Sequence, residues 1–146
     1  MNINIKRLSP LATIPSYATD GSGCFDIYAM FENLGDKADI YPGGARAIRT
    51  GIQVAVPKDH VMLIYSRSGH GFNYDVCLAN CVGVIDSDYR GEIMVKLTAD
   101  GDGYTVRHGD RIAQGMIVPF KRVEFIEVDS LDGTARGSGG FGSTGA

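Results

Sequence analysis

The sequence lacks any apolar run that approaches the roughly 20 residues of a membrane-spanning helix. Its first ten residues, MNINIKRLSP, lack the apolar core and the cleavage site of a secretory signal. We therefore expect no membrane partner and a cytoplasmic location, in the host cytoplasm if a virus or phage encodes the protein. The 146 residues, 44% of them hydrophobic, are enough for one compact domain with a core.

Cysteine and positive charge are also scarce. Cys24, Cys77 and Cys81 form no CxxC pair, which argues against a disulfide framework or a zinc site. We expect three buried or partly buried free thiols in a reducing compartment. The formal net charge of −3 offers no general attraction for a nucleic-acid polymer, so we expect no such partner. A small anionic ligand would need a local positive site.

No segment shows sustained helical periodicity, and the 20 glycines predict many turns and few long helices. Strand alternation is clear instead. Short strands separated by regular turn signals are typical of an all-β barrel or a double-sheet jelly roll. One strand region is predicted from residues that alternate along the chain and share a face: Ile48, Thr50, Ile52, Val54 and Val56. Further strands are predicted at residues 61–65, 112–118 and 121–128, and turns at 42–44, 57–59 and 100–103.

Residues 83–92, GVIDSDYRGE, are the most informative segment. They place Asp86, Asp88 and Tyr89 between two apolar runs, residues 82–85 and 93–97. This pattern predicts a β-hairpin whose exposed tip carries chemistry.

The C-terminal segment, residues 136–146, reads RGSGGFGSTGA and cannot bury apolar area. We expect a single β-barrel domain over residues 1–135, followed by this flexible tail. Glycines let backbone N–H groups approach phosphate oxygens, Arg136 adds a cation, and Phe141 could stack on a base. The alternative is a flexible tail without function.

Three further polar sites are weaker signals. Arg67, Ser68 and Gly69 follow the predicted strand at residues 61–65, so we expect them in a loop. This loop would either bind a phosphate or be a solvated turn without function. Asp26 lies between apolar neighbours and is expected to pair with an arginine such as Arg67, or to lie near a metal. Gln114 either bonds the backbone or faces a ligand. We interpret the three histidines, His60, His70 and His108, as surface residues.

Five segments in this order resemble the motifs of the homotrimeric dUTPase family, the deoxyuridine triphosphate nucleotidohydrolases. The resemblance implies a jelly-roll protomer in a threefold trimer with active sites shared among subunits. It also implies Mg²⁺-dependent hydrolysis of dUTP to dUMP and pyrophosphate, which limits uracil incorporation into DNA and supplies dUMP for dTMP synthesis. The segments are SGCFDIYA (22–29), YSRSG (65–69), LANCVGVIDSDYRGE (78–92), GDRIAQGMIVP (109–119) and RGSGGFGSTG (136–145).

The resemblance also implies roles for residues. Asp86 would contact the 3′-hydroxyl and be the general base for a water that attacks the α-phosphorus, and Tyr89 would exclude a ribose 2′-hydroxyl. Asp26 would order the hydration shell of Mg²⁺. The base would be read by Asn80, Gly83, Val84 and Ile85; the phosphates would be held by Arg67, Ser68, Gly69, Gln114 and Arg136; and Phe141, Gly142, Ser143 and Thr144 would close over the substrate.

The sequence departs from the family pattern at four places. Cys24 stands where glycine is usual, Ser66 where proline is usual, and His70-Gly71 where Leu-Ala is usual. Residues 31–39 look like a polar insertion, which we interpret as a surface loop rather than a partner contact. The first three departures bear on the rigidity of the loops and not on the chemistry, because Asp26, Arg67, Ser68 and Gly69 all remain.

Two other functions remain open. A dCTP deaminase of the same superfamily would need a glutamate near the pyrimidine C4 and a different segment at residues 83–92. A nucleotide-sensing interaction protein would use the tail as its switch and the insertion as its contact.

Overall fold

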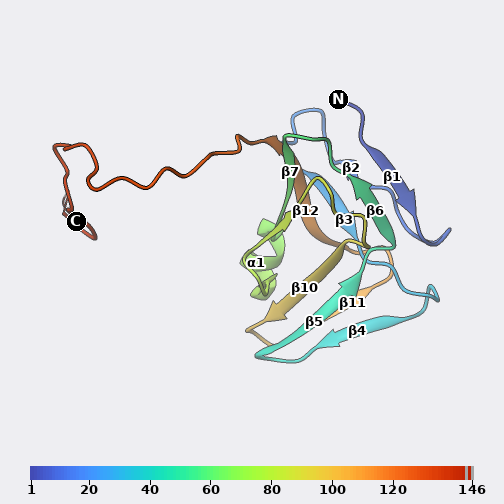
Figure 1. The fold of residues 1–146 in the computed structure, drawn as a ribbon. Helices are drawn as coiled ribbons and strands as arrows, with labels where there is room; N and C mark the ends of the chain where they lie inside the picture. The colour runs from blue at the N-terminus through green and yellow to red at the C-terminus, as the bar shows by residue number, and fades with distance from the viewer. Residues whose placement is uncertain (144, 146) are drawn as a thin grey trace.

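The computed structural model describes residues 1–143 and 145, and its ordered part is built almost entirely from strands (Figure 1). Alternating apolar side chains form most of the strands, and turns with glycine, proline or aspartate connect many of them. The strands are β1 (Asn4–Arg7), β2 (Ser16–Tyr17), β3 (Phe25–Tyr28), β4 (Lys37–Ile40), β5 (Gly44–Arg49), β6 (Ile52–Ala55), β7 (His60–Tyr65), β8 (Val76–Leu78), β9 (Val82–Ile85), β10 (Met94–Ala99), β11 (Tyr104–Arg107) and β12 (Arg111–Pro119), and the helix is α1 (Ser68–Tyr74).

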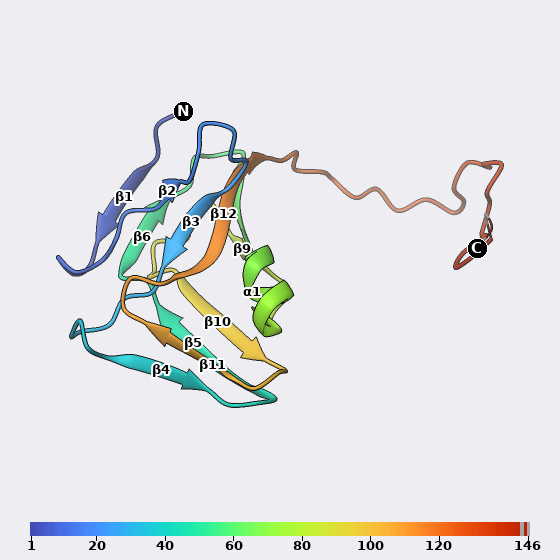
Figure 2. The same ribbon diagram turned by 180° about the vertical axis from the view of Figure 1, so that it is seen from behind.

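The strands pair antiparallel in four sheets, mostly with partners distant in sequence (Figures 1 and 2). The largest sheet has the order β2-β3-β12-β7-β9, and a second has the order β5-β10-β8. Two-stranded sheets β1-β6 and β11-β4 complete the arrangement. This all-β architecture confirms the predicted jelly-roll-like protomer.

The core lies between these sheets. The alternating face predicted from Ile48 to Val56 is confirmed, since all five of its side chains are buried. Gly51 lets the chain pass from β5 into β6, because its φ of +69° suits glycine and a Cβ there would lie 2.7 Å from the Cβ of Ala12. The predicted turns at 42–44, 57–59 and 100–103 are likewise confirmed, each containing a residue with positive φ.

The predicted hairpin around residue 86 is wrong. β9 pairs with β7, whereas β10 pairs with β5 and β8, so the two apolar runs belong to different sheets. Local alternation identifies each strand, but the partner of a strand is chosen by packing across the whole domain.

Four other predictions need correction. Residues 121–128 form no strand: they are exposed and pair with none of the strands among the described residues. Within the predicted 31–39 loop, the last residues belong to β4, which pairs with β11. Ser68 begins a helix rather than a loop. Cys81 is exposed, although Cys24 and Cys77 are partly buried as expected.

Nothing in the described part of the chain combines the helical length and apolar character that a membrane crossing requires.

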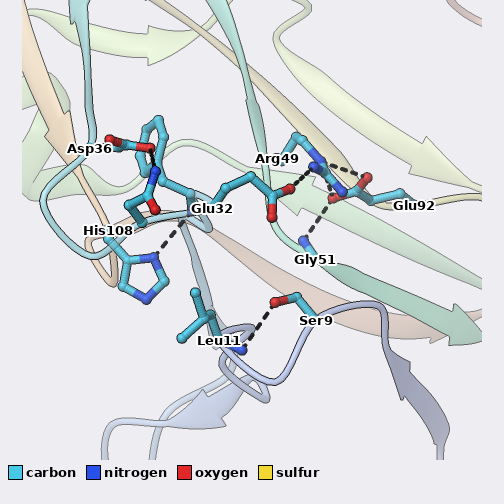
Figure 3. Close-up of polar contacts among 10 residues, drawn as sticks. Ser9, Leu11, Glu32, Asp36, Arg49, Gly51, Glu92 and His108 are labelled. Atoms are coloured by element: carbon cyan, nitrogen blue, oxygen red, sulfur yellow. Dashed lines mark hydrogen bonds and ion pairs between the residues drawn. The ribbon is translucent and has the colours of Figure 1, made fainter.

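Glu92 ties the turn after β9 to the corner between β5 and β6 (Figure 3). One of its carboxylate oxygens accepts a hydrogen bond from the Gly51 N–H at 2.8 Å, and both accept from Arg49 Nε at 3.1–3.2 Å. The Glu92 hydrogen bond and charge raise the pKa of Arg49. On its outer side, Arg49 also pairs with Glu32. The largely buried carboxylate of Glu92 therefore fixes the turn after β9 to the β5–β6 corner.

We expect Glu92→Ala to lower the free energy of unfolding by about 1–3 kcal/mol, because the Gly51 N–H loses its acceptor. Glu32→Ala is the matched control, since its side chain is 68% exposed whereas that of Glu92 is 17% exposed. The control should change stability by less than about 0.5 kcal/mol. Urea unfolding at one fixed protein concentration measures both, and equal losses would contradict the assignment.

Candidate functional site

Three of the strands place polar residues in one row across the largest sheet. Asp26 on β3 lies opposite Gln114 on β12, and Gln114 lies opposite Tyr65 at the end of β7. Directly opposed residues share a face, so the side chains of Asp26 and Gln114 lie side by side. The chain then leaves β7 and reaches Arg67 within two residues.

Asp26 holds two arginines at the end of this row. It is 8% exposed, and its carboxylate accepts from Arg67 Nε at 3.3 Å and from Arg111 Nη1 at 3.2 Å. A register shift between Arg111 and Ala113 places Arg111 opposite Tyr28, which brings it to the face that carries Asp26. The predicted pairing of Asp26 with Arg67 is confirmed, and Arg111 is a second partner that the sequence pattern did not reveal.

Two hydrogen bonds fix the loop before α1. Gln114 Nε2 donates to the Ser66 carbonyl at 3.2 Å, so the backbone-bonded alternative for Gln114 holds in this structure. The Ser66 hydroxyl accepts from the Leu78 N–H at 2.8 Å. Serine at this position therefore anchors the loop through its side chain, which replaces the rigidity that a proline would supply.

Arg67 and Arg111 line a polar hollow of about 320 Å³. His70 and Tyr104 form its deeper wall, with ring centres 5.2 Å apart. His70 is only 6% exposed, so its interpretation as a surface residue is wrong. Burial and then the neighbouring Arg67 lower its pKa. Its position in place of an apolar residue was the available signal for this burial.

A second hollow, of about 290 Å³, opens between β9 and β10. It exists because these strands belong to different sheets and diverge. The four residues predicted to read the base all line it: Asn80, Gly83, Val84 and Ile85. Sequence reasoning missed Met94 and Lys96, which also line it, although strand alternation on β10 places them on one face.

The turn after β9 is held by its own contacts. Asp86 is exposed, and its carbonyl accepts from the Tyr89 N–H at 3.2 Å. Tyr89 Oη donates to the Glu92 carbonyl at 3.0 Å, and its ring covers Gly91, where a Cβ would lie 2.3 Å from Tyr89 Oη. The Asp86 carboxylate has no hydrogen-bond partner among the described residues.

Asp86 and Arg67 lie at opposite ends of neighbouring strands. The register pairs Ile85 with Met62 and Val82 with Tyr65, so Asp86 follows one end of β9 and Arg67 follows the far end of β7. Four residues of strand separate these ends, or about 13 Å. A single chain therefore does not bring Asp86 and Arg67 together.

The tail runs away from the sheets (Figure 1). Arg136 Nε donates to the Gly139 carbonyl at 2.9 Å, and the Phe141 side chain is fully exposed. Gly142 has a φ of +78°, and the Ser143 N–H donates to the Gly140 carbonyl. Thr144, the remaining predicted tail residue, lies outside the described residues.

Magnesium was predicted to reach Asp26 through water. Among the described residues no group of three or more His, Cys, Asp or Glu side chains could hold a metal directly. Each oxygen of Asp26 already accepts from one arginine and keeps a further lone pair. A contact through bridging water to a hydrated Mg²⁺ fits this donor set, because Mg²⁺ usually keeps several of its waters.

The fold is that of a jelly-roll protein, and two arginines line one of its hollows. A family model described as dUTPase matches residues 11–145. The deoxyuridine 5′-triphosphate nucleotidohydrolase of Anaplasma marginale is 47% identical over 133 residues, which cover 90% of this chain and 88% of that protein. That of Helicobacter pylori is 42% identical over 146 residues, with 99% and 97% covered. The chain belongs to the dUTPase family.

Solved structures agree on the fold. A mutant dUTPase of Staphylococcus bacteriophage 80alpha with dUpNHpp has a TM-score of 0.89 at 24% identity and covers 99% of each chain. A mutant dUTPase from phage phi11 of S. aureus, described with a coordinated structural Mg(II) ion, has a TM-score of 0.80 at 20% identity and covers 89% of this chain and 98% of that one.

Proposed function

We propose that the protein hydrolyses dUTP to dUMP and pyrophosphate with Mg²⁺. The observation that carries this proposal is the hollow between β9 and β10, where the four residues predicted to read the base meet in a chain of the dUTPase family. The proposed role is to limit uracil incorporation into DNA and to supply dUMP for dTMP synthesis. The cytoplasmic location stays a prediction.

The base would be read in this hollow. Gly83 keeps the β9 backbone close to Ile64, since a Cβ there would lie 3.2 Å from the Ile64 Cβ. Uracil could thus approach the backbone of residues 83–85 and the amide of Asn80. Fixed backbone donors and acceptors discriminate strongly, because a mispaired buried polar edge is costly.

Tyr89 would exclude ribose because its ring is fixed by Gly91 and by its hydrogen bond to the Glu92 carbonyl. We expect Tyr89→Ala to reduce the preference for dUTP over UTP by about 10- to 200-fold, measured as the ratio of kcat/KM values. Tyr89→Phe keeps the ring and serves as the control. An unchanged ratio in the alanine variant would contradict the steric role.

The phosphates would lie against the hollow that contains Arg67. Arginine forms bidentate, charge-assisted hydrogen bonds to phosphate, and the first N–H groups of a helix, here at Ser68 and Gly69, have no acceptor within the helix. Gln114 Nε2 donates one of its two hydrogens to the Ser66 carbonyl and would offer the other to the phosphates. Mg²⁺ would supply charge neutralisation, with Asp26 ordering its water shell.

Asp86 would activate water. Its carboxylate takes a proton as the water oxygen bonds to the α-phosphorus, and the bond from that phosphorus to the bridging oxygen breaks, so pyrophosphate leaves. This step needs a carboxylate that is not already engaged, which agrees with the exposed position of Asp86.

We propose a homotrimer with shared sites. The separation of Asp86 from Arg67 within one chain supports it, because the base hollow of one subunit could then face the arginines of another. The segment that follows β12 also exposes apolar side chains, an arrangement typical of an interaction surface. These are Val123, Phe125, Ile126 and Val128. Light scattering that returned a monomer would contradict the trimer.

The tail of residues 136–146 would close over the bound nucleotide from a neighbouring subunit. Arg136 would reach the phosphates, Phe141 would cover the uracil, and the segment from Gly142 to Thr144 would cover the triphosphate.

The direct test is pyrophosphate release from dUTP by the purified protein with Mg²⁺, with and without a chelator. We expect Mg²⁺-dependent release of pyrophosphate and dUMP. No turnover under these conditions would refute the proposal, and ammonia release from dCTP would instead favour the deaminase.

A further inference from the structure

His70 lies behind Arg67, in the wall of the polar hollow. Its Nε2 is 3.4 Å from Arg67 Nη1 and 3.4 Å from Tyr104 Oη, and its side chain is almost completely buried. The Nδ1 atom of the same ring is buried and has no hydrogen-bond partner among the described residues. A buried imidazole with one engaged nitrogen and one unpaired nitrogen is an unusual choice for a position that an aliphatic side chain could fill.

The chemistry of Arg67 determines which tautomer this contact needs. One tautomer of His70 would donate from Nε2 to Tyr104 Oη, but a guanidinium only donates hydrogen bonds, so accepting from Arg67 requires a lone pair on Nε2. The proton of neutral His70 then resides on Nδ1, where it finds no partner among the described residues. Leaving a buried donor unpaired destabilises the fold, so this arrangement gives up stability for the contact with Arg67.

We propose that His70 is a positioning residue for the predicted phosphate-binding Arg67. Asp26 accepts from Arg67 Nε, and neutral His70 accepts from Arg67 Nη1. Two hydrogen bonds at different nitrogens therefore fix the orientation of the guanidinium group. The Arg111 carbonyl, 3.5 Å from the same Nη1, lies at the edge of this arrangement. The inference rests on the proposed function, since the orientation of Arg67 affects turnover only if Arg67 binds the triphosphate.

The surrounding charges keep His70 neutral. Arg67 and Arg111 oppose its protonation, whereas Asp110 favours it, and burial is the largest cause of its lowered pKa. Tyr104 faces the ring from β11, and Cys77 is the only titratable side chain of β8, the strand against α1. A lowered pKa means that protonation favours the unfolded chain. The folded state therefore loses stability as the pH falls below about 6.5, the ordinary value for histidine, and keeps it at higher pH.

Two substitutions separate positioning from packing. His70→Gln retains an acceptor near the place of Nε2 but does not titrate, whereas His70→Leu fills the space without an acceptor. With dUTP and Mg²⁺ above neutral pH, we expect the leucine variant to raise KM by about 3- to 10-fold with little change in kcat. The glutamine variant should stay within about twofold of the native protein. A KM of the leucine variant equal to that of the native protein would overturn the proposal.

Acid pH provides the second readout. The melting temperature of the native protein should fall as the pH drops below about 6.5, and its kcat/KM should fall at the lower pH where folded His70 becomes protonated. Both variants should lose less, because neither carries the titrating ring. Thermal unfolding of His70→Leu at neutral pH shows whether the variant is folded, and we expect no loss of Tm there. A native pH profile matched by both variants would overturn the proposal.

Nitrogen NMR of the imidazole decides the tautomer without any turnover. We expect neutral His70 with its proton on Nδ1 at neutral pH, and a proton on Nε2 would overturn the proposal. If the native protein failed to hydrolyse dUTP, the proposed function would be refuted, while the tautomer measurement would still confirm or refute the contact with Arg67.

Discussion

Replacing Asp86 with asparagine is expected to reduce kcat for dUTP hydrolysis by about 10²- to 10⁴-fold, the usual contribution of a general base. Asparagine has nearly the same shape but cannot take a proton from the attacking water. Because Asp86 is exposed and its side chain contacts no described residue by hydrogen bonding, the substitution should leave folding unchanged. Pyrophosphate release measures kcat, and calorimetry with a non-hydrolysable dUTP analogue measures Kd, which should change little.

Asp88→Asn is the matched control for this prediction. Asp88 lies two residues further along the same turn and is also exposed, but we interpret it as a turn or interface residue. Its variant should keep kcat within about twofold. If Asp86→Asn instead lost nucleotide binding, Asp86 would be an anchor for the sugar rather than the base.

Deleting residues 136–146 is expected to lower kcat/KM by roughly 10²- to 10⁴-fold. A hydrogen bond from a charged group such as Arg136 contributes about 1.5–3 kcal/mol, and stacking of an aromatic ring on a base contributes about 1–3 kcal/mol. Their sum, about 2.5–6 kcal/mol, corresponds to this change in rate. Steady-state kinetics of the deleted and full-length proteins measure it.

Stability is the control for the deletion. The hydrogen bonds of the described tail residues lie within the tail, as between Arg136 and Gly139, or reach only Thr134 just before it, so the urea midpoint should not change. Phe141→Ala should show part of the loss and Phe141→Tyr should restore it, because tyrosine keeps the stacking ring. A deleted protein with the full rate would mean that the tail is only a flexible extension.

Much of the fold could be predicted because its signals are local. Alternation located the strands that contain Ile48, Ile52 and Val54, and positive-φ turns occurred where glycine, proline and aspartate cluster. The hairpin around Asp86 was mispredicted because strand pairing is not local: β9 lies beside β7 rather than β10. This correction matters for the proposed function, since the hollow that Asn80 and Gly83 line lies between β9 and β10.

His70 and Arg111 show a second limit of sequence patterns. The neighbours of His70 in the sequence do not indicate its burial, and the one signal is that it stands where the family usually has an apolar residue. Its environment comes from Tyr104 on β11 and Arg111 on β12. Likewise, Arg111 reaches Asp26 only because a register shift in β12 changes the face on which it lies. Neither contact has a fixed sequence spacing.

The sequence by itself determined the family resemblance, the all-β class and the identity of the chemical groups, because motifs and alternation are properties of neighbouring residues. Only the tertiary structure decided how those groups are distributed between the two ends of the largest sheet. Long-range strand register gathers Asp26, Arg67 and Arg111 at one end of the sheet and places Asp86 at the other. Backbone pairing across sheets sets these distances, and no spacing along the chain encodes them.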